Sequence, residues 1–403
     1  MRFLILTQYY PPETGAPQNR LSAMARHLSA SGHTVDVLTA MPHYPEMRIV
    51  PEYRRRWFYR ERIGGCDVIR SWIYVSAKRS VVSRLLNYFS FTATSILASL
   101  RLQWRYDVVF CESPPLFLGM SGYLISRTKQ AKLILNVSDL WPDSVQMLGV
   151  VTSRSLLSLA GRLERFLYRR SHMVTCQTQG IVAQVMLRAP GQRVYWLPNG
   201  VDEELLDTDR DQEWRIRHGF RDEEFLILYA GIIGLAQGLD VVLDAAKLIE
   251  PGRRIRFLVL GDGPEKERLM ARARDEGIDN VRFIARVPRS AVSRILSAMD
   301  ATVIPLRKLD LFEGAIPSKI FESLAMGKPV LLGVDGEARR LFIDRGRGGL
   351  HFEPGNARAL AKAAISLCDT PKLVAQLGAN GRAFVREHFL RPDITKKWLR
   401  ELR

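Results

Sequence analysis

Residues 225–246 read FLILYAGIIGLAQGLDVVLDAA, and this stretch decides the class of fold. It begins with a short apolar run of strand length, turns at Gly231, Gly234 and Gly238, and continues with the apolar spacing of a helix. A buried strand that passes through a glycine turn into a helix is the first half of a βαβ unit. The stretch therefore predicts an α/β fold with a parallel sheet.

The same alternation of apolar runs and helical patterns continues on both sides of this stretch. Residues 198–224 interrupt it with turn residues and charge, so we predict two doubly wound domains, 1–197 and 198–387. Such sheets bind ligands at the carboxyl ends of their strands, and the two domains are expected to face each other across a cleft. The predicted strands are 3–7, 34–40, 107–113, 132–138, 173–178, 225–231, 256–263, 281–287, 301–306 and 329–334.

The composition is that of an ordinary globular protein. The 403 residues are 47% hydrophobic and 25% charged, which excludes a disordered or fibrous chain. Four cysteines lie far apart without a CxxC pair, which excludes a disulfide framework and a zinc ribbon. Arg2 is followed directly by a strand-like run and not by a signal peptide, so we expect the protein to face the cytoplasm.

The net charge of +17 is concentrated in the first half of the chain. Residues 1–200 hold 25 basic and 11 acidic side chains, a net charge of +14, whereas the other 203 residues have a net charge of +3. A field this uneven indicates an anionic partner, which can be nucleic acid, an anionic membrane surface or a polyanionic soluble substrate. A generally basic proteome would give the same pI.

The 16 uncharged residues 85–100, LLNYFSFTATSILASL, raise the question of membrane contact. They are too few and too polar to span a bilayer, which needs about 20 apolar residues. An interfacial helix and a buried core helix both fit. The stretch 54–62, with five arginines and three aromatic residues, can lie beside that helix against anionic lipid. It also fits a solvated basic loop or a nucleic-acid patch.

Residues 11–20, PPETGAPQNR, follow a predicted strand and precede a predicted helix. Gly15 can bring backbone amides against a phosphate at the start of that helix. By itself the segment is more simply an ordinary strand-to-helix turn, because the sequence offers no clear nicotinamide fingerprint or Walker A loop.

The stretch 312–333, FEGAIPSKIFESLAMGKPVLLG, reads as a loop, a helix and a strand. Pro317 and Ser318 are typical of a helix start, and Ser318 is expected to cap the helix with its side chain. Gly327 and Pro329 are expected to end the helix and lead into the strand.

Lys319 and Glu322 share one face of this helix, since they are three residues apart. A cation at a helix N-terminus opposes the helix dipole unless an anion binds there, and a diphosphate above Lys319 would provide that anion. Glu322 would then accept hydrogen bonds from ribose hydroxyls. An ordinary salt bridge between the two residues explains the charges but not the Pro-Ser-Lys start. The glycine turn 231–238 lies across the same strand edge and adds amides that can bind phosphate oxygens.

Taken together, these motifs resemble retaining glycosyltransferases of family four, which have the GT-B fold of two Rossmann-like domains. The resemblance covers essentially the whole chain, and its specificity lies in the order and spacing of the motifs. SDLWPDS (138–144), AQGLD (236–240) and PSKIFE (317–322) are similar to the subgroup that builds O-antigen, colanic acid and related lipid-linked glycans, often with fucose-type or N-acetylamino sugars. The other matching segments are 197–202, 260–269, 280–292, 321–330, 354–367 and 378–389.

The resemblance implies roles for single residues. Glu322 matches the second glutamate of the family's Glu-x7-Glu motif, which holds the nucleotide ribose. The first glutamate falls on Gly314, so Glu313 beside it is the candidate to contact the donor sugar. The family's N-domain histidine near the donor sugar falls on Ser138, and Asp139 is the nearest polar candidate.

Two phosphate-binding cations of the family are absent from the glycine turn, where this chain has Ile232 and Gln237. Lys319 is expected to replace one of them, and Arg307 or Lys308 the second. The resemblance further implies that the backbone around Arg286 contacts the base. The expected donor-binding residues are therefore Gly15, Gly234, Gln237, Arg286, Ser318, Lys319 and Glu322, and the catalytic candidates are Glu313 and Asp139.

The function implied by the resemblance is sugar transfer with retention from a nucleotide-sugar donor, expected to be UDP-linked. The expected acceptor is a polyprenyl-diphosphate-linked glycan in O-antigen, capsule or exopolysaccharide biosynthesis. The basic first half is expected to hold this acceptor at the cytoplasmic membrane through peripheral contact with anionic lipid, and no nucleic-acid partner is expected. Residues 388–403 are expected to form a helix that packs back on the first domain.

We expect neither a cofactor nor a metal. The DxD triplet at 207–209 lies in the linker, and no His/Asp cluster has ligand spacing. Fixed positive charge from Lys319, glycine-turn amides and helix N-termini is expected to stabilise the leaving diphosphate. Two alternatives stay open. One is a UDP-sugar epimerase, which needs acid and base carboxylates in the cleft. The other is a non-catalytic scaffold subunit, which the missing Arg, Lys and His at 232, 237 and 138 make plausible, whereas Lys319 and Glu322 argue against an inactive donor site.

Overall fold

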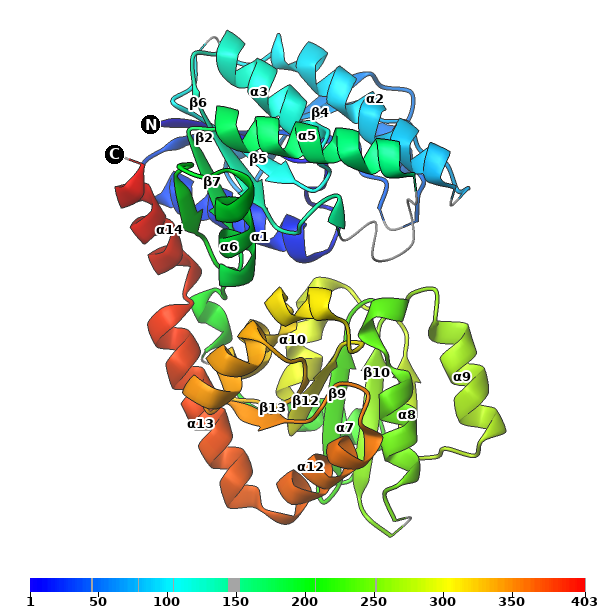
Figure 1. The fold of residues 1–403 in the computed structure, drawn as a ribbon. Coiled ribbons are helices and arrows are strands. Elements are labelled where there is room, and N and C mark those ends of the chain that lie inside the picture. Colours follow the sequence, from blue (N-terminus) through cyan, green and yellow to red (C-terminus); the bar gives the residue numbers. More distant parts are fainter. Residues whose placement is uncertain are drawn as a thin grey trace. The chain divides into compact units, whose positions relative to one another are not determined.

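The computed structural model describes residues 1–44, 46–78, 80–103, 105–143, 153–206, 208–250 and 252–402. The chain divides into two compact units (Figure 1). The first contains Met1–Asn199 together with Arg391–Arg403, and the second contains Gly200–Leu390. Each unit has a parallel sheet of its own, as the two series of apolar runs predict.

The first unit is built on an eight-stranded sheet in the order β3-β4-β2-β1-β5-β6-β7-β8. Its described strands pair in parallel, except that β3 runs antiparallel to β4. Buried parallel strands are apolar on both faces, which is why most of them read as continuous apolar runs. The strands are β1 (Arg2–Leu6), β2 (Thr34–Ala40), β3 (Phe58–Ile63), β4 (Cys66–Ser71), β5 (Val108–Ser113), β6 (Lys132–Val137), β7 (Met173–Cys176) and β8 (Val194–Trp196).

Helices cover both faces of this sheet. Helices α2, α3, α5 and α6 contribute to one hydrophobic core, and α1 and α14 to the core on the other face. A short 3₁₀ helix, Pro51–Tyr53, precedes β3. The helices are α1 (Ala16–Ala30), α2 (Val81–Ser99), α3 (Leu118–Thr128), α5 (Arg154–Arg170), α6 (Gln179–Arg188) and α14 (Arg391–Glu401).

The second unit has a six-stranded parallel sheet in the order β11-β10-β9-β12-β13-β14. Helices α8, α9, α12 and α13 pack on one face, and α7 and α10 on the other. The strands are β9 (Phe225–Ala230), β10 (Ile255–Leu260), β11 (Val281–Ile284), β12 (Ala301–Pro305), β13 (Val330–Gly333) and β14 (Gly349–His351). The helices are α7 (Gln212–Arg217), α8 (Asp240–Lys247), α9 (Lys266–Asp275), α10 (Arg289–Ser297), α11 (Lys319–Ala325), α12 (Ala357–Asp369) and α13 (Pro371–His388), with single turns at Glu203–Leu205, Leu235–Gln237 and Asp310–Gly314 and a π-helix at Arg339–Arg345.

Four strands lie outside the predicted set: β3, β4, β8 and β14. Strand β3 is the edge strand of the first sheet and carries alternating charges, so it lacks the apolar run of a buried strand. The interpretation of 54–62 as a loop is therefore wrong for residues 58–62, which belong to β3. Strands β8 and β14 have only three residues each, too few for a pattern.

Helix α2 contains the uncharged segment 85–100 up to Ser99. Phe91 and Ala98 are fully buried, whereas Leu86 and Leu97 are about half exposed. One face of α2 therefore belongs to the core, and the other lies at the surface. Among the described residues, no helix is long and apolar enough to cross a membrane.

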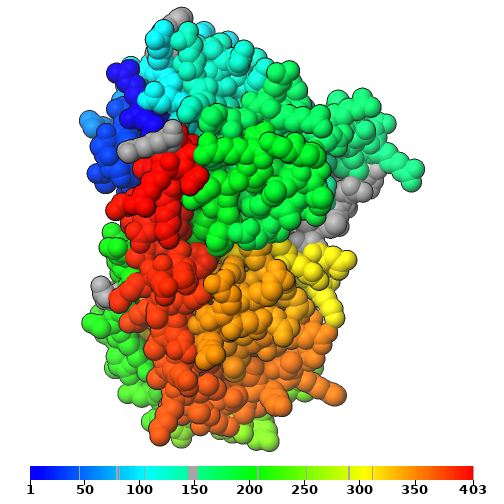
Figure 2. Space-filling view, turned by 60° about the vertical axis from the view of Figure 1, so that its left-hand side comes forward, coloured from blue at the N-terminus to red at the C-terminus, as the bar shows by residue number. Residues whose placement is uncertain are grey.

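The helix α14 belongs to the first unit, although it follows the second unit in the chain. Trp398 is fully buried and its ring lies 6.1 Å from Phe3 and 5.4 Å from Phe110. Lys132 Nζ donates a hydrogen bond to the carbonyl of Leu402 at 3.4 Å. In Figure 2 the red end of the chain lies between blue and green residues of the first unit.

Candidate functional site

The glycine turn 231–238 continues from the carboxyl end of β9 in the second unit. Gly231 has φ 146°, and its N–H donates to Leu260 O at 2.9 Å. A Cβ at this position would lie 2.6 Å from Lys319 Cε and 2.7 Å from Lys319 Nζ. Glycine at 231 therefore allows the lysine to reach the end of the strand.

Lys319 is the first residue of α11, and its Nζ lies 3.8 Å from the centre of the Tyr229 ring. Among the described residues it has no hydrogen-bond acceptor and no ion-pair partner, so the proposed salt bridge to Glu322 does not form. Desolvation lowers the pKa of Lys319 to about 7, and the negative charge of Glu322 acts in the opposite direction. An anionic ligand would therefore strongly stabilise the charged form of Lys319.

Ser318 occupies the N-cap position of α11, but the prediction that its side chain caps the helix is wrong. Ser318 already has helical angles, φ −59° and ψ −23°, whereas a capping side chain needs an extended backbone. The predicted end of the helix is confirmed. The helix stops at Ala325, Gly327 has φ 67°, and β13 begins directly after Pro329.

Of the two candidates for a second cation, Arg307 lies against the glycine turn. Its backbone N–H donates to Ala236 O at 2.9 Å, and its Cγ would lie 3.1 Å from a Cβ on Gly238. Its guanidinium has no acidic partner among the residues that the structure describes. Lys308, in contrast, donates to Glu353 at 2.7 Å. Arg307 is therefore the cation available to a ligand.

The other predicted residues of the second unit lie in α11 and in the loops at the same edge of the sheet. Gln237 ends the turn Leu235–Gln237, and its Oε1 would lie 3.0 Å from a Cβ on Gly234. Glu322 is one turn into α11 and half-buried. Glu313, in the turn Asp310–Gly314, and Arg286, which follows β11, are exposed.

Gly15 and Asp139 belong to the first unit. Gly15 is the N-cap residue of α1, and a Cβ there would lie 2.6 Å from Gln18 Oε1. Asp139 follows the end of β6 and is half-buried. The two catalytic candidates, Glu313 and Asp139, thus come from different units.

A buried network beside Asp139 was missed in the sequence. Glu112 Oε1 accepts hydrogen bonds from Arg20 Nη2 at 2.5 Å and from the Ser138 hydroxyl, and its Oε2 accepts from Asn136 Nδ2 at 2.7 Å. Asn136 Oδ1 accepts from the Thr175 hydroxyl at 2.8 Å. Because three donors satisfy the carboxylate, Glu112 serves to fix Ser138 and Arg20 in place. Polar residues at paired positions of β5 and β6 were the available signal.

A second buried cluster lies where β1 and β2 end. Glu13 Oε1 accepts from the backbone N–H groups of His43 at 2.9 Å and Tyr44 at 2.8 Å, and burial raises the pKa of Glu13 to about 7. His43 Nδ1 lies 2.8 Å from the Met41 carbonyl and is therefore the protonated nitrogen. Burial lowers the pKa of His43 to about 4, and its Nε2 has no partner among the described residues. It is a neutral, buried acceptor.

The described residues contain no cluster of three histidine, cysteine, aspartate or glutamate side chains suited to a metal ion. Asp207 of the DxD triplet lies outside the described residues. At the edge of the second sheet, Lys319 and Arg307 flank the glycine turn 231–238. This arrangement is suited to an anion with two charged groups. Two α/β units, the second of which has such an edge, are the architecture expected of a GT-B glycosyltransferase.

Family models support this class over most of the chain. The model described as glycosyl transferases group 1 matches residues 210–384, and the glycosyl transferase 4-like domain matches residues 15–200. The chain belongs to the group 1 glycosyltransferases of the GT-B fold.

Individual relatives agree with this family. The chain is 27% identical to the putative colanic acid biosynthesis glycosyl transferase WcaI of Escherichia coli K12 over 336 residues, 81% of this chain and 82% of that protein. The structure of Anabaena Alr3699/HepE in complex with UDP and glucose has a TM-score of 0.74 at 16% identity, covering 99% of this chain and 98% of that one. WaaG, a glycosyltransferase involved in lipopolysaccharide biosynthesis, has a TM-score of 0.70 at 17% identity and covers 98% of both chains.

Proposed function

We propose that this enzyme transfers a sugar from a UDP-linked donor, with retention, to a polyprenyl-diphosphate-linked glycan in O-antigen, capsule or exopolysaccharide biosynthesis. The sugar is expected to be of the fucose or N-acetylamino type. The relative named for colanic acid biosynthesis supports the class of product, and the neighbour in complex with UDP and glucose supports the donor.

The observation that carries the donor site is the position of Lys319. Its Nζ lies on the Tyr229 ring beside Gly231 and has no anionic partner among the described residues. Arg307 adds a second positive charge at Gly238. The diphosphate of the donor would accept hydrogen bonds from both cations and from turn amides, while Glu322 would bind the ribose and the backbone near Arg286 the base.

The same charges would serve the reaction. Lys319 and Arg307 would stabilise the negative charge that develops on the leaving diphosphate, without a metal ion or another cofactor. The acceptor hydroxyl would attack on the face from which the diphosphate leaves, and the departing phosphate would take its proton. Glu313 would contact the donor sugar from the second unit, and Asp139 would act from the first.

The basic first half would hold the acceptor. A polyprenyl-diphosphate-linked sugar is anionic and resides in the membrane, and residues 1–200 have a net charge of +14. The enzyme would work on the cytoplasmic side, in peripheral contact with anionic lipid and without a nucleic-acid partner.

Thermal unfolding with a panel of UDP-, GDP- and dTDP-linked sugars tests the donor site. A donor at about 100 times its Kd stabilises the folded protein by about 2.7 kcal/mol. We expect one base to give this stabilisation, and Lys319→Met, Arg307→Gln and Glu322→Gln to reduce it. Lys308→Gln is the matched control, because this neighbouring cation is paired with Glu353.

The outcomes separate the alternatives. No stabilisation by any donor would contradict the proposal and favour a scaffold subunit. Donor binding followed by conversion of the UDP-sugar to its epimer, with no acceptor present, would identify an epimerase. Transfer to a short-chain polyprenyl-diphosphate glycan, with retention established by NMR of the product, would support the transferase.

A further inference from the structure

The buried face of helix α2 is rich in polar side chains, which lie there beside Phe91 and Ala98. Asn87 Oδ1 accepts from Gln8 Nε2 at 2.7 Å, and Asn87 Nδ2 donates to Tyr74 O at 2.7 Å. The hydroxyls of Ser95 and Ser121 lie 2.7 Å apart. The buried polar residues of the helix are Ser83, Asn87, Thr94, Ser95 and Ser99. A surface helix of a water-soluble domain ordinarily has most of its polar side chains on the outer face and its apolar side chains inside.

The opposite face of α2 is apolar and open to solvent. The exposed apolar side chains follow one another at intervals of three or four residues, so they form one stripe along the helix. We call it the α2 stripe. It consists of Val82, Leu86, Phe89, Ala93, Leu97 and Leu100, and its five larger side chains are between 47% and 78% exposed. A continuous exposed apolar surface of this kind marks an interaction site.

A row of arginines lies in the same helical layer. Helix α3 packs against both α2 and α5, and the Tyr123 and Phe166 rings are 5.3 Å apart (Figure 1). Arg162, Arg165 and Arg169 form the arginine row on α5, and none has an acidic partner among the described residues.

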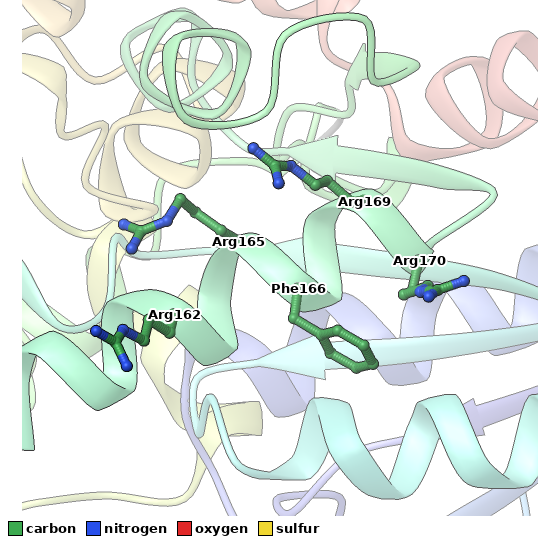
Figure 3. Close-up of a pocket in the computed structure, with 5 residues that line it drawn as sticks. All are labelled: Arg162, Arg165, Phe166, Arg169 and Arg170. Carbon is green, nitrogen blue, oxygen red and sulfur yellow. The ribbon is translucent and has the colours of Figure 1, made fainter.

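The arginine row borders a pocket of about 360 Å³ that Phe166 and Arg170 complete. Figure 3 shows the three guanidinium groups of the row pointing to one side of the helix and the Phe166 ring to another. The pocket therefore offers several cationic donors and one aromatic side chain, which suits a phosphate group attached to a larger molecule.

Basic and aromatic residues also border the far end of the stripe. The Arg101 guanidinium, just after α2, lies 3.7 Å from the centre of the Phe58 ring. Trp57, beside Phe58, is 65% exposed. Tryptophan and arginine are the residues that settle at the headgroup level of a bilayer.

We propose that the layer of α2, α3 and α5 is a bilayer-docking surface, in which the α2 stripe enters the headgroup–acyl boundary and the arginine row binds the phosphates of anionic lipids. The inference rests on the proposed lipid-linked acceptor and identifies the surface that reaches it. A nucleic acid would pair with the arginines but leave the stripe in water. If a second copy of the protein covered this face, the arginine rows of the two copies would face and repel each other. A bilayer satisfies both features at once.

Sedimentation with vesicles tests this surface on the full chain. We expect binding to vesicles of phosphatidylcholine mixed with phosphatidylglycerol, and weaker binding to phosphatidylcholine alone. Leu86→Glu with Leu97→Glu should abolish binding to both. Arg162→Gln, Arg165→Gln and Arg169→Gln together should weaken partitioning to the anionic vesicles by about a hundredfold and reduce its salt dependence. Leu248→Glu and Arg358→Gln, on exposed positions of the second unit, are the matched controls.

The proposal is overturned if the wild-type chain binds neither type of vesicle, or if the two glutamates on α2 leave binding unchanged. It is also overturned if the chain is a dimer that the same glutamates dissociate, because a second copy would then cover the stripe. Stabilisation by UDP-sugar is measured on every variant. It should be unchanged by the α2 substitutions, so a missing donor response in a vesicle-binding protein would count against the proposed function alone.

Discussion

The Nζ of Lys319 lies 3.8 Å from the centre of the Tyr229 ring, at the end of the strand that leads into the glycine turn. The ring attracts the ammonium group but cannot accept its three hydrogen bonds. The lysine is thus held in position with its hydrogen-bonding capacity unused by the described residues. This arrangement costs folding energy and favours binding of an anion.

Replacing Lys319 with methionine separates these two effects. Donor affinity should fall by about 10- to 100-fold, because a hydrogen bond to a charged group contributes about 1.5–3 kcal/mol. The free protein should be as stable as the wild type or more stable, because an apolar side chain of similar volume replaces a desolvated cation. Calorimetric titration and thermal unfolding measure the two quantities. A large loss of stability in the free protein would indicate a structural role for the lysine instead.

Donor binding should depend on pH through the same group. The pKa of Lys319 is about 7 in the free protein, and an anion binds the protonated form. The Kd for a UDP-sugar should therefore rise by up to about tenfold per pH unit above pH 7 and level off below it. Lys319→Arg stays charged throughout, so its Kd should be nearly constant. An equal slope in both proteins would assign the dependence to another group.

Donor affinity should fall above pH 7, but the stability of the donor-free protein should rise with pH because of the same lysine. Between pH 7 and the unfolded lysine pKa of about 10.4, the unfolded chain binds a proton that folded Lys319 has lost. The contribution of Lys319 to the free energy of unfolding therefore rises with pH in this window. Thermal unfolding of the wild type and of Lys319→Met across the window measures the difference.

Removing the Glu112 carboxylate should destabilise the first unit. Glu112→Ala leaves Arg20, whose side chain is only 10% exposed, as a buried charge without its partner. The expected loss is about 3–5 kcal/mol in the free energy of unfolding. Asp67→Ala breaks the exposed pair with Arg60 and should cost at most about 1 kcal/mol. Equal losses from the two substitutions, measured by hydrogen exchange of β5 and β6, would contradict the assignment.

Between about pH 4 and 7, Glu13 and His43 should change the free energy of unfolding in opposite directions. The pKa of Glu13 is raised to about 7, so its contribution to stability falls as pH rises from about 4.3 to 7. The pKa of His43 is lowered to about 4, so its contribution rises between about pH 4 and 6.5. Glu13→Gln should therefore show a steeper rise of stability with pH than the wild type, by up to about 1.4 kcal/mol per unit. Parallel curves from urea unfolding would contradict this expectation.

Most strands could be predicted because a buried parallel strand is a continuous apolar run. Strand β4 could not, since Arg70 lies within it and is fully buried. Its guanidinium donates to Glu61 in β3 and to the carbonyls of Ala40 and Pro11, which are 30 and 59 residues away. Only the assembled fold brings these acceptors together, so the local pattern does not indicate a buried strand.

In the candidate site, too, some features could be predicted from the local sequence and others depend on the assembled fold. The start and end residues of α11 predicted where the helix lies, but not that Ser318 is already helical. Arg307 and Lys308 are adjacent and alike in sequence, and they differ because Glu353, 45 residues further on, pairs with Lys308. The Glu112–Asn136 pair was predictable from polar residues near two strand ends, whereas its contact with Arg20 depends on how α1 packs. The roles of the donor-binding and catalytic residues stay predictions.

The return of α14 to the first unit has a consequence for folding during translation. Trp398 completes a core with Phe3 and Phe110, yet the ribosome makes Gly200–Leu390 before it reaches this tryptophan. The second unit is contiguous in the chain and can close its core while the core of the first still lacks Trp398. We therefore expect the nascent first unit to expose this part of its core throughout synthesis of the second, and a stop codon introduced after residue 390 would leave it exposed.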